Sequence, residues 1–220
     1  NDNAFSSLAE APRPSFATCN YLVTSRRYRQ PLLRDSTQAM QNTQGSRREA
    51  MVAQLSPAAR HGTGPLAGLM RDGALHCVFQ PLADLREGSV YAHEALIRGP
   101  QGGPWHAPDA LLAQARTEGV LQDFELFCVF TALEQWSAQA TPGRLFVNIS
   151  ADALVHGVGM VGMAKLGEAV RSCGLNARML VLEITEHERV TDMPLLREAI
   201  DAVHACGARM ALDDFGDGRS

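Results

Sequence analysis

The chain has 220 residues, of which 45% are hydrophobic and 20% are charged, which fits one ordinary domain with a tail and excludes a fibrous or wholly disordered protein. The formal charge of −4 hides an asymmetry, because residues 1–65 sum to +4 and residues 66–220 to −8. No apolar stretch approaches the roughly 20 residues that cross a bilayer, and none resembles a secretory signal. The five cysteines are scattered without a C-x-x-C pair, so we expect reduced side chains in a cytoplasmic protein.

Residues 1–65 are rich in Ser, Gln, Asn, Arg and Pro and show no sustained apolar period. This composition predicts a linker or a mostly disordered basic arm. Its basic cluster at residues 26–29 is more typical of a solvated surface than of a nucleic-acid contact, so no nucleic acid polymer is expected as a partner.

From residue 66 onward, apolar runs alternate with helical segments. Two runs, 75–82 and 89–97, flank a turn that contains Gly88 and predict a β-hairpin. Two helices are expected next, over 108–118 with Gly119 as the stop and over 121–138. Further strands at 145–149, 179–184 and 209–213 are separated by a helix that ends before Cys173 and a helix that Pro194 opens. Apolar strands with helices between them indicate an α/β fold with a largely parallel sheet.

In four of these strands the apolar run terminates in an acid or an amide, namely Glu94, Asn148, Glu183 and Asp213, and Asp214 follows directly. The last three strand ends are separated by 35 and 30 residues, about one βαβ repeat each. In a (β/α) barrel the carboxyl ends of the strands share one rim. Each acid alone could be a solvated carboxylate or a helix cap, but the ordered set predicts one convergent site.

Three carboxylates, an amide oxygen and an adjacent carboxylate form an all-oxygen ligand set. Such a set suits Mg²⁺ or Mn²⁺ better than zinc, which prefers His and Cys. Two divalent ions about 3.5–4 Å apart neutralise crowded acids, activate a water and stabilise a leaving oxygen. The pattern therefore points to phosphodiester hydrolysis.

The motifs resemble those of the EAL domain family, in the same order and at suitable spacing. Residues 66–220 would be the amino-terminal portion of such a domain. The motifs that carry the resemblance are Phe79-Gln80-Pro81-Leu82, Glu94-Ala95-Leu96 with Arg98, Asn148-Ile149-Ser150, Leu182-Glu183-Ile184-Thr185-Glu186 and Asp213-Asp214-Phe215-Gly216.

The resemblance implies a TIM-like barrel whose first strand is antiparallel, here incomplete with about five strands, and hydrolysis of cyclic di-GMP to linear pGpG with Mg²⁺ or Mn²⁺. Catalysis would rest on Glu94, Asp213, Asp214 and Glu186, and a homodimer is an assembly open to the family. By resemblance, the first metal would be held by Glu94, Asn148, Glu183 and Asp213. Asp213 would be shared with the second metal, which Asp214 would serve, and Glu186 would steady the neighbouring loop. The ligand would be contacted by Gln80, Leu96 and Arg98.

The chain departs from the family pattern in ways that bear on activity. Its only lysine, Lys165, does not match the lysine of the later family segments, and Gly99 stands where a Trp is usual. We therefore expect the chain to be inactive alone unless other residues complete the barrel. Two other hypotheses stay open, a non-catalytic module that binds cyclic di-GMP or a protein partner, and a remnant without a stable fold.

Overall fold

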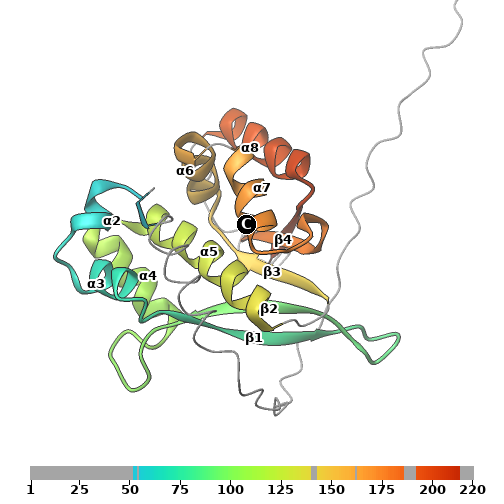
Figure 1. Ribbon diagram of the computed structural model, residues 1–220, viewed down its shortest axis with the longest axis horizontal. Helices are drawn as coiled ribbons and strands as arrows, with labels where there is room; N and C mark the ends of the chain where they lie inside the picture. The colour runs from blue at the N-terminus through green and yellow to red at the C-terminus, as the bar shows by residue number, and fades with distance from the viewer. Residues whose placement is uncertain (1–51, 54, 140–142, 162, 186–191, 214–220) are drawn as a thin grey trace, which may run out of the picture.

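A single mixed sheet organises the protein, in the strand order β1-β2-β3-β4-β5 (Figure 1). The computed structural model describes residues 52–53, 55–139, 143–161, 163–185 and 192–213. The first two strands pair antiparallel and the other neighbours pair parallel. The strands are β1 His76–Ala83, β2 Val90–Arg98, β3 Arg144–Asn148, β4 Leu180–Thr185 and β5 Arg209–Asp213. The predicted hairpin and the antiparallel first strand are confirmed, and over the described residues the sheet does not close, as expected for an incomplete barrel.

The helices between the strands follow the sequence prediction with one difference. The segment before Cys173 forms two helices, on either side of residue 162, where one helix was expected. Two further helices, Pro57–His61 and Pro65–Arg71, precede the sheet and were not predicted, and the first of them lies in the segment that was expected to be a linker. Gly119, with a φ of 69°, ends α4 in the left-handed conformation that glycine adopts without strain. The helices are α2 Pro57–His61, α3 Pro65–Arg71, α4 Pro108–Glu118, α5 Leu121–Gln139, α6 Ala151–Val161, α7 Met163–Ser172 and α8 Met193–Cys206, with a short 3₁₀ turn at Ala177–Met179.

The strands are apolar almost throughout because each contributes to two cores. Outward-facing residues such as Val147 and Leu182 pack with helices α5, α6 and α8 in the main core. Inward-facing residues, two of which are Phe146 and Val181, form a smaller apolar cluster on the opposite face. Successive side chains of a strand point to opposite faces. A residue two positions after a member of this inner cluster therefore faces the same way. The acids and the amide at the strand ends thus lie directly above the inner apolar cluster, which forms the apolar floor of this edge.

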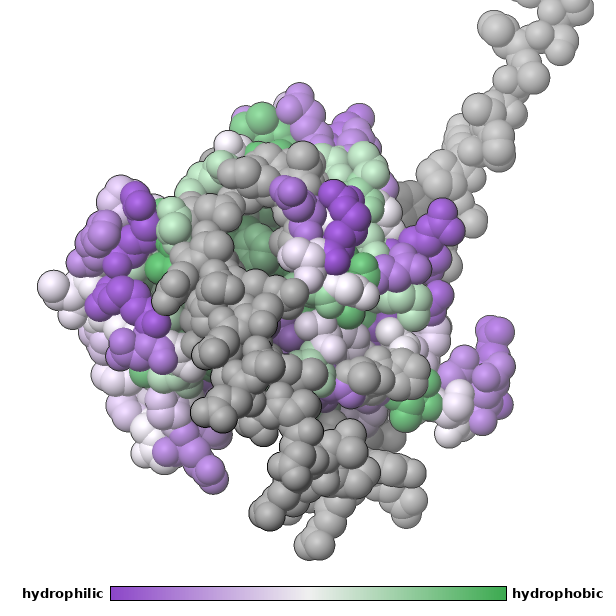
Figure 2. Space-filling view, in the orientation of Figure 1, coloured by the Kyte–Doolittle hydropathy of each residue, from purple (hydrophilic) through white to green (hydrophobic). Residues whose placement is uncertain are grey.

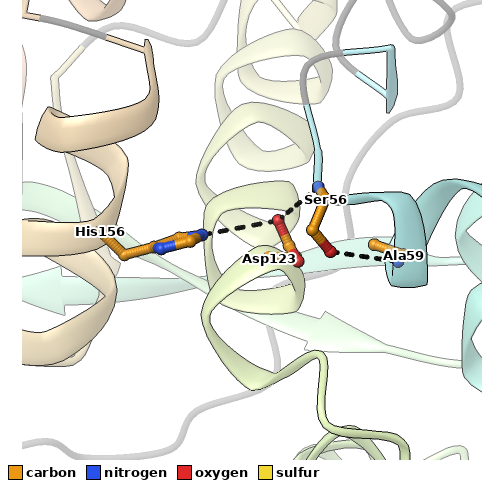
Figure 3. Close-up of polar contacts among 4 residues, drawn as sticks. All are labelled: Ser56, Ala59, Asp123 and His156. Atoms are coloured by element: carbon orange, nitrogen blue, oxygen red, sulfur yellow. Dashed lines mark hydrogen bonds and ion pairs between the residues drawn. The ribbon is translucent and has the colours of Figure 1, made fainter.

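A third apolar cluster joins α2 and α3 to α4 and the first half of α5. Two carboxylates reinforce it. The Glu118 carboxylate accepts from the backbone N–H groups of Leu66 (2.8 Å) and Ala67 (3.1 Å) at the start of α3. The buried Asp123 accepts from the Ser56 backbone N–H at 3.0 Å, and His156 of α6 lies 3.7 Å from the same oxygen (Figure 3). Residues 55–71 are thus docked by both apolar and charged contacts.

On the side seen in Figure 2, hydrophilic residues cover the outer surfaces of α2, α3 and α4 and the tip of the β1–β2 hairpin. In the part of the chain that the structure describes, none of the helices has the length and hydropathy of a membrane span.

We predict that Glu118→Ala destabilises the protein by about 1–2 kcal/mol, since the start of α3 then loses its hydrogen-bond acceptor. Chemical denaturation followed by circular dichroism measures the change. The matched control is Glu198→Ala, at an exposed position of α8, which should stay within about 0.5 kcal/mol of wild type. Equal stability of the two variants would show that the carboxylate does not hold α3.

Candidate metal and ligand site

The structure brings together polar side chains from separate strands at the carboxyl edge of the sheet. The Asn148 amide Nδ2 donates to Glu94 Oε1 at 2.8 Å, which joins β3 to β2. In the next ladder Asn148 lies directly beside Glu183. Asp213, at the end of β5, is near enough for its charge to act on both Glu94 and Glu183. All four side chains are half-buried and so remain open to a ligand on one side.

The pairing register explains how these residues reach one another. Glu94 lies beside Phe146, two residues before Asn148, whereas Asp213 lies beside Thr185, two residues beyond Glu183. Strands of a barrel are tilted and staggered, so residues at one level of the barrel are offset in register. The stagger follows that rule, and the four side chains share the inner face above the apolar floor.

Burial, more than repulsion between the carboxylates, raises the pKa values of the glutamates at this edge. Burial, followed by the charges on Glu94 and Asp213, raises the pKa of Glu183 to about 8. The pKa of Glu94 is also raised, mainly by burial and further by Asp213, while the Asn148 hydrogen bond and the Arg98 charge oppose the shift. The negative charges are thus incompletely compensated by the protein's own groups.

The donor set fits a hard divalent cation in its chemistry, because carboxylate and amide oxygens are the ligands that such ions prefer. A cation would also compensate the buried negative charge and relieve the smaller contribution from repulsion between the carboxylates. Within the described residues, no three His, Cys, Asp or Glu side chains are grouped closely enough to hold a metal ion by themselves. The predicted second-metal ligand Asp214 and the loop residue Glu186 lie outside the described residues.

The three predicted ligand-binding residues lie on the β1–β2 hairpin. Gln80 is paired directly with Glu94, so their side chains share the inner face. Leu96 and Arg98 are two and four residues beyond Glu94 and therefore face the same way. Arg98 Nη1 donates to the Ile97 carbonyl at 2.8 Å, which positions the guanidinium at the rim. Gln80, Leu96 and Arg98 thus form a row on the inner face of the hairpin, which begins beside Glu94 and runs toward the end of β2.

Sequence reasoning did not predict the contact that fixes the turn after β3. The Ser150 hydroxyl donates to the Glu125 carboxylate of α5, and its oxygen accepts from the Ala153 N–H at 3.0 Å. Ser150 thereby caps α6 two residues after Asn148 and ties that turn to α5. The preference of serine for the first position of a helix was the signal that could have revealed it.

Gly99, which follows Arg98, has no space for a side chain. A Cβ at this position would lie 2.1 Å from the Trp105 carbonyl oxygen. The loop that approaches it is closed by two contacts between Gly99 and His106, one through backbone atoms at 3.2 Å and one from the ring Nδ1 at 3.1 Å. The absence of a side chain at residue 99 therefore allows the loop over residues 100–106 to pack against the end of β2.

Known proteins are similar to this chain in sequence and in fold. Residues 66–220 match the EAL domain family model. A cyclic di-GMP phosphodiesterase of Pseudomonas aeruginosa is 32% identical over 153 residues, which cover 66% of this chain and 25% of that protein. Uncharacterized proteins of Mycobacterium tuberculosis and Mycobacterium bovis are 31% identical over 154 residues, so the chain spans about a quarter of the length of these relatives.

Solved structures agree with this comparison. A manganese and cyclic di-GMP complex of Klebsiella pneumoniae BlrP1 matches this chain with a TM-score of 0.58 and 27% identity. The match covers 67% of this chain and 36% of the BlrP1 chain. The same protein has also been solved as a calcium and cyclic di-GMP complex. The FimX EAL domain of Xanthomonas citri, at 18% identity and a TM-score of 0.57, covers 78% of this chain and 62% of that chain and supports the fold alone.

The fold is therefore that of an α/β protein of the TIM-like barrel type, with an acidic cluster at the carboxyl ends of its strands. The chain belongs to the EAL domain family.

We predict that Glu183→Gln changes the pH dependence of stability in metal-free protein. The folded-state pKa of Glu183, about 8, exceeds its ordinary value of 4.5, so between these values the folded state binds more protons than the unfolded state. Wild-type stability should fall as pH rises through this window, by at least about 1 kcal/mol, since one pKa unit corresponds to about 1.4 kcal/mol. Denaturation in EDTA at about pH 5 and about pH 8 measures the change in stability, and the variant should lose most of it, with the remainder coming from the raised pKa of Glu94. A change in Glu183→Gln as large as that of wild type, or a change lost in the exposed control Glu198→Gln, contradicts this assignment.

We further predict that Gly99→Ala lowers stability by about 1–3 kcal/mol, because the added Cβ meets the Trp105 backbone rather than a movable side chain. Gly68→Ala is the control, because a Cβ there meets nothing within 4 Å and Gly68 lies inside α3. That substitution should stabilise the protein by about 0.5–1 kcal/mol. Thermal melts of both variants give the comparison, and a Gly99→Ala variant as stable as wild type would show that the loop yields.

Proposed function

We propose that this chain supplies the carboxylate-rich part of a metal-dependent phosphodiesterase that hydrolyses cyclic di-GMP to linear pGpG with Mg²⁺ or Mn²⁺. The observation that carries the proposal is the meeting of Glu94, Asn148 and Glu183 at one edge of the sheet, with the Asp213 charge close by. The similarity to a cyclic di-GMP phosphodiesterase supports the choice of substrate. The manganese complex of BlrP1 supports the use of a divalent cation.

The proposed roles divide between two groups of residues. The first ion would be held by Glu94, Asn148, Glu183 and Asp213. Asp213 and Asp214 would serve the second ion, and Glu186 would steady the adjacent loop. When bound, the ions supply an activated water and stabilise charge on the phosphate and the leaving oxygen.

The ligand itself would be held by the β1–β2 hairpin. Gln80 offers an amide to the edge of a base, Leu96 packs against the ligand, and Arg98 forms paired hydrogen bonds with a phosphate. Gln80 lies beside Glu94, whereas Arg98 lies at the other end of this row of residues. One molecule of cyclic di-GMP would therefore contact both the acids and Arg98.

A second candidate function is binding of cyclic di-GMP without turnover. The observation that favours it is that Gln80, Leu96 and Arg98 lie together on one hairpin, independent of the strands that carry Asn148, Glu183 and Asp213. The resemblance also implies a catalytic lysine that no residue of this chain matches. By itself, the 220-residue chain is therefore expected to bind the cation and the dinucleotide with little or no turnover.

We predict that Mn²⁺ raises the melting temperature of the chain and that Glu94→Ala abolishes the effect. At a concentration 100 times its dissociation constant, a ligand that binds only the folded state stabilises it by about 2.7 kcal/mol. Glu198→Ala should keep the full response, because residue 198 is exposed on α8. A melting temperature unchanged by Mn²⁺ would contradict the metal site.

Incubation with cyclic di-GMP and Mn²⁺, followed by chromatography for pGpG, then separates enzyme from binder. Formation of pGpG that requires Glu94 supports the phosphodiesterase. Binding of cyclic di-GMP without any pGpG, unchanged by Glu94→Ala, favours the binding module for this chain.

A further inference from the structure

On the inner face of the β1–β2 hairpin, Leu96 has a proposed role in ligand binding, but the apolar residue paired with it has none. In the antiparallel register Val78 lies directly opposite Leu96, one row above the pair formed by Gln80 and Glu94. Side chains opposite one another in such a pair are about 4.5–5.5 Å apart at Cβ. Val78 therefore extends the apolar surface of Leu96 across the hairpin, from β2 onto β1.

Contacts of the neighbouring residues fix the direction in which Val78 points. Cys77 and Phe79 pack against the main core, which lies on the outer face of the sheet. Leu82 packs with the inner apolar cluster, and the only register shift between the two strands comes after it, between Leu82 and Ala83. By alternation, Val78 and Gln80 share the inner face with Leu82.

Val78 lies on β1, the edge strand of the described sheet, and is 40% exposed, whereas the inner-face residue Ala92, nearer the inner apolar cluster, is fully buried. The core does not use Val78, although its side chain stands beside the polar residues of the candidate site. Two aliphatic side chains at this spacing form one continuous apolar surface.

We propose that Val78 is a ligand-contacting residue which, together with Leu96, forms an apolar wall against the flat face of a guanine base. The inference rests on the proposed binding of cyclic di-GMP and adds the residue that completes one side of its base site. The amide of Gln80 lies one row below the wall, where it can address the edge of the same base, and Arg98 lies one row above, on the phosphate side. Burial of the base face against the two side chains would then contribute to affinity without any hydrogen bond.

Isothermal titration of the 220-residue chain with cyclic di-GMP in EDTA, where turnover is suppressed, tests the wall. Val78→Thr keeps the shape of the side chain and its strand propensity, but places a hydroxyl against the base. We expect binding about 3- to 10-fold weaker, since a methyl contact is lost and the hydroxyl is desolvated without a partner. Val78→Ile keeps the wall apolar and should bind within about twofold of wild type.

Val90→Thr is the matched control, because Val90 is also an exposed valine of this hairpin, at 54%, but lies opposite Ala83 at its far end. Circular dichroism melts confirm that all variants are folded. Wild-type-like affinity of Val78→Thr overturns the wall and leaves the proposed function standing. Equal losses in Val78→Thr, Val78→Ile and Val90→Thr would assign the effect to the hairpin as a whole and also overturn it. Failure of the wild-type chain to bind cyclic di-GMP overturns both this inference and the proposed binding.

Discussion

The hydrogen bond from Asn148 to Glu94 joins two strands at the place where a buried glutamate and an aspartate add their negative charges. Burial is the main cause of the raised pKa values of Glu94 and Glu183, and repulsion between neighbouring carboxylates adds to it. The sheet must therefore be rigid enough to keep these groups together against their repulsion. The apolar residues directly beneath them provide that rigidity.

Each candidate ligand stands two positions beyond an inward-facing apolar residue of its own strand. Phe146 precedes Asn148 and Val181 precedes Glu183 in this way, and both belong to the inner apolar cluster. The alternate residues of the same strands pack outward against the helices. A strand clamped on both faces cannot rotate or slip by one residue without moving its polar end to the wrong side of the sheet. The packing that fixes the register of the strands therefore also fixes the positions of the candidate ligands.

Much of this arrangement could be predicted from local sequence. Gly88 and Gly119 marked a hairpin turn and a helix end, and both adopt the positive φ that glycine favours. Strand ends were readable because an apolar run stopping at a carboxylate or amide is conspicuous. The convergence of Glu94, Asn148, Glu183 and Asp213 then followed from the shared rim of a barrel. The stagger between neighbouring strands was not predictable, because register depends on the tilt of the whole sheet.

Contacts between distant segments also escaped prediction. Glu118 holds the start of α3 across about 50 residues of chain, and Ser150 reaches Glu125 on a neighbouring helix. Neither glutamate has a sequence signal of its own, because a glutamate on a helix looks like any solvated charge, although the serine is a recognisable helix cap. At Gly99, too, the space is filled by the backbone of its own loop, which only the folded structure reveals.

The acidic edge is difficult to explain as a structural feature alone. A fold that needed only to join β2, β3 and β4 would gain stability from apolar side chains at Glu94 and Glu183, since burial of crowded carboxylates opposes folding. These carboxylates are costly without a compensating charge, and a bound cation would be correspondingly favourable, because it would replace the protons that the raised pKa values otherwise admit. The same reasoning links cation affinity to pH, with protons and metal competing for the same oxygens. Under the proposed function, binding of a hard cation would offset this local cost to stability.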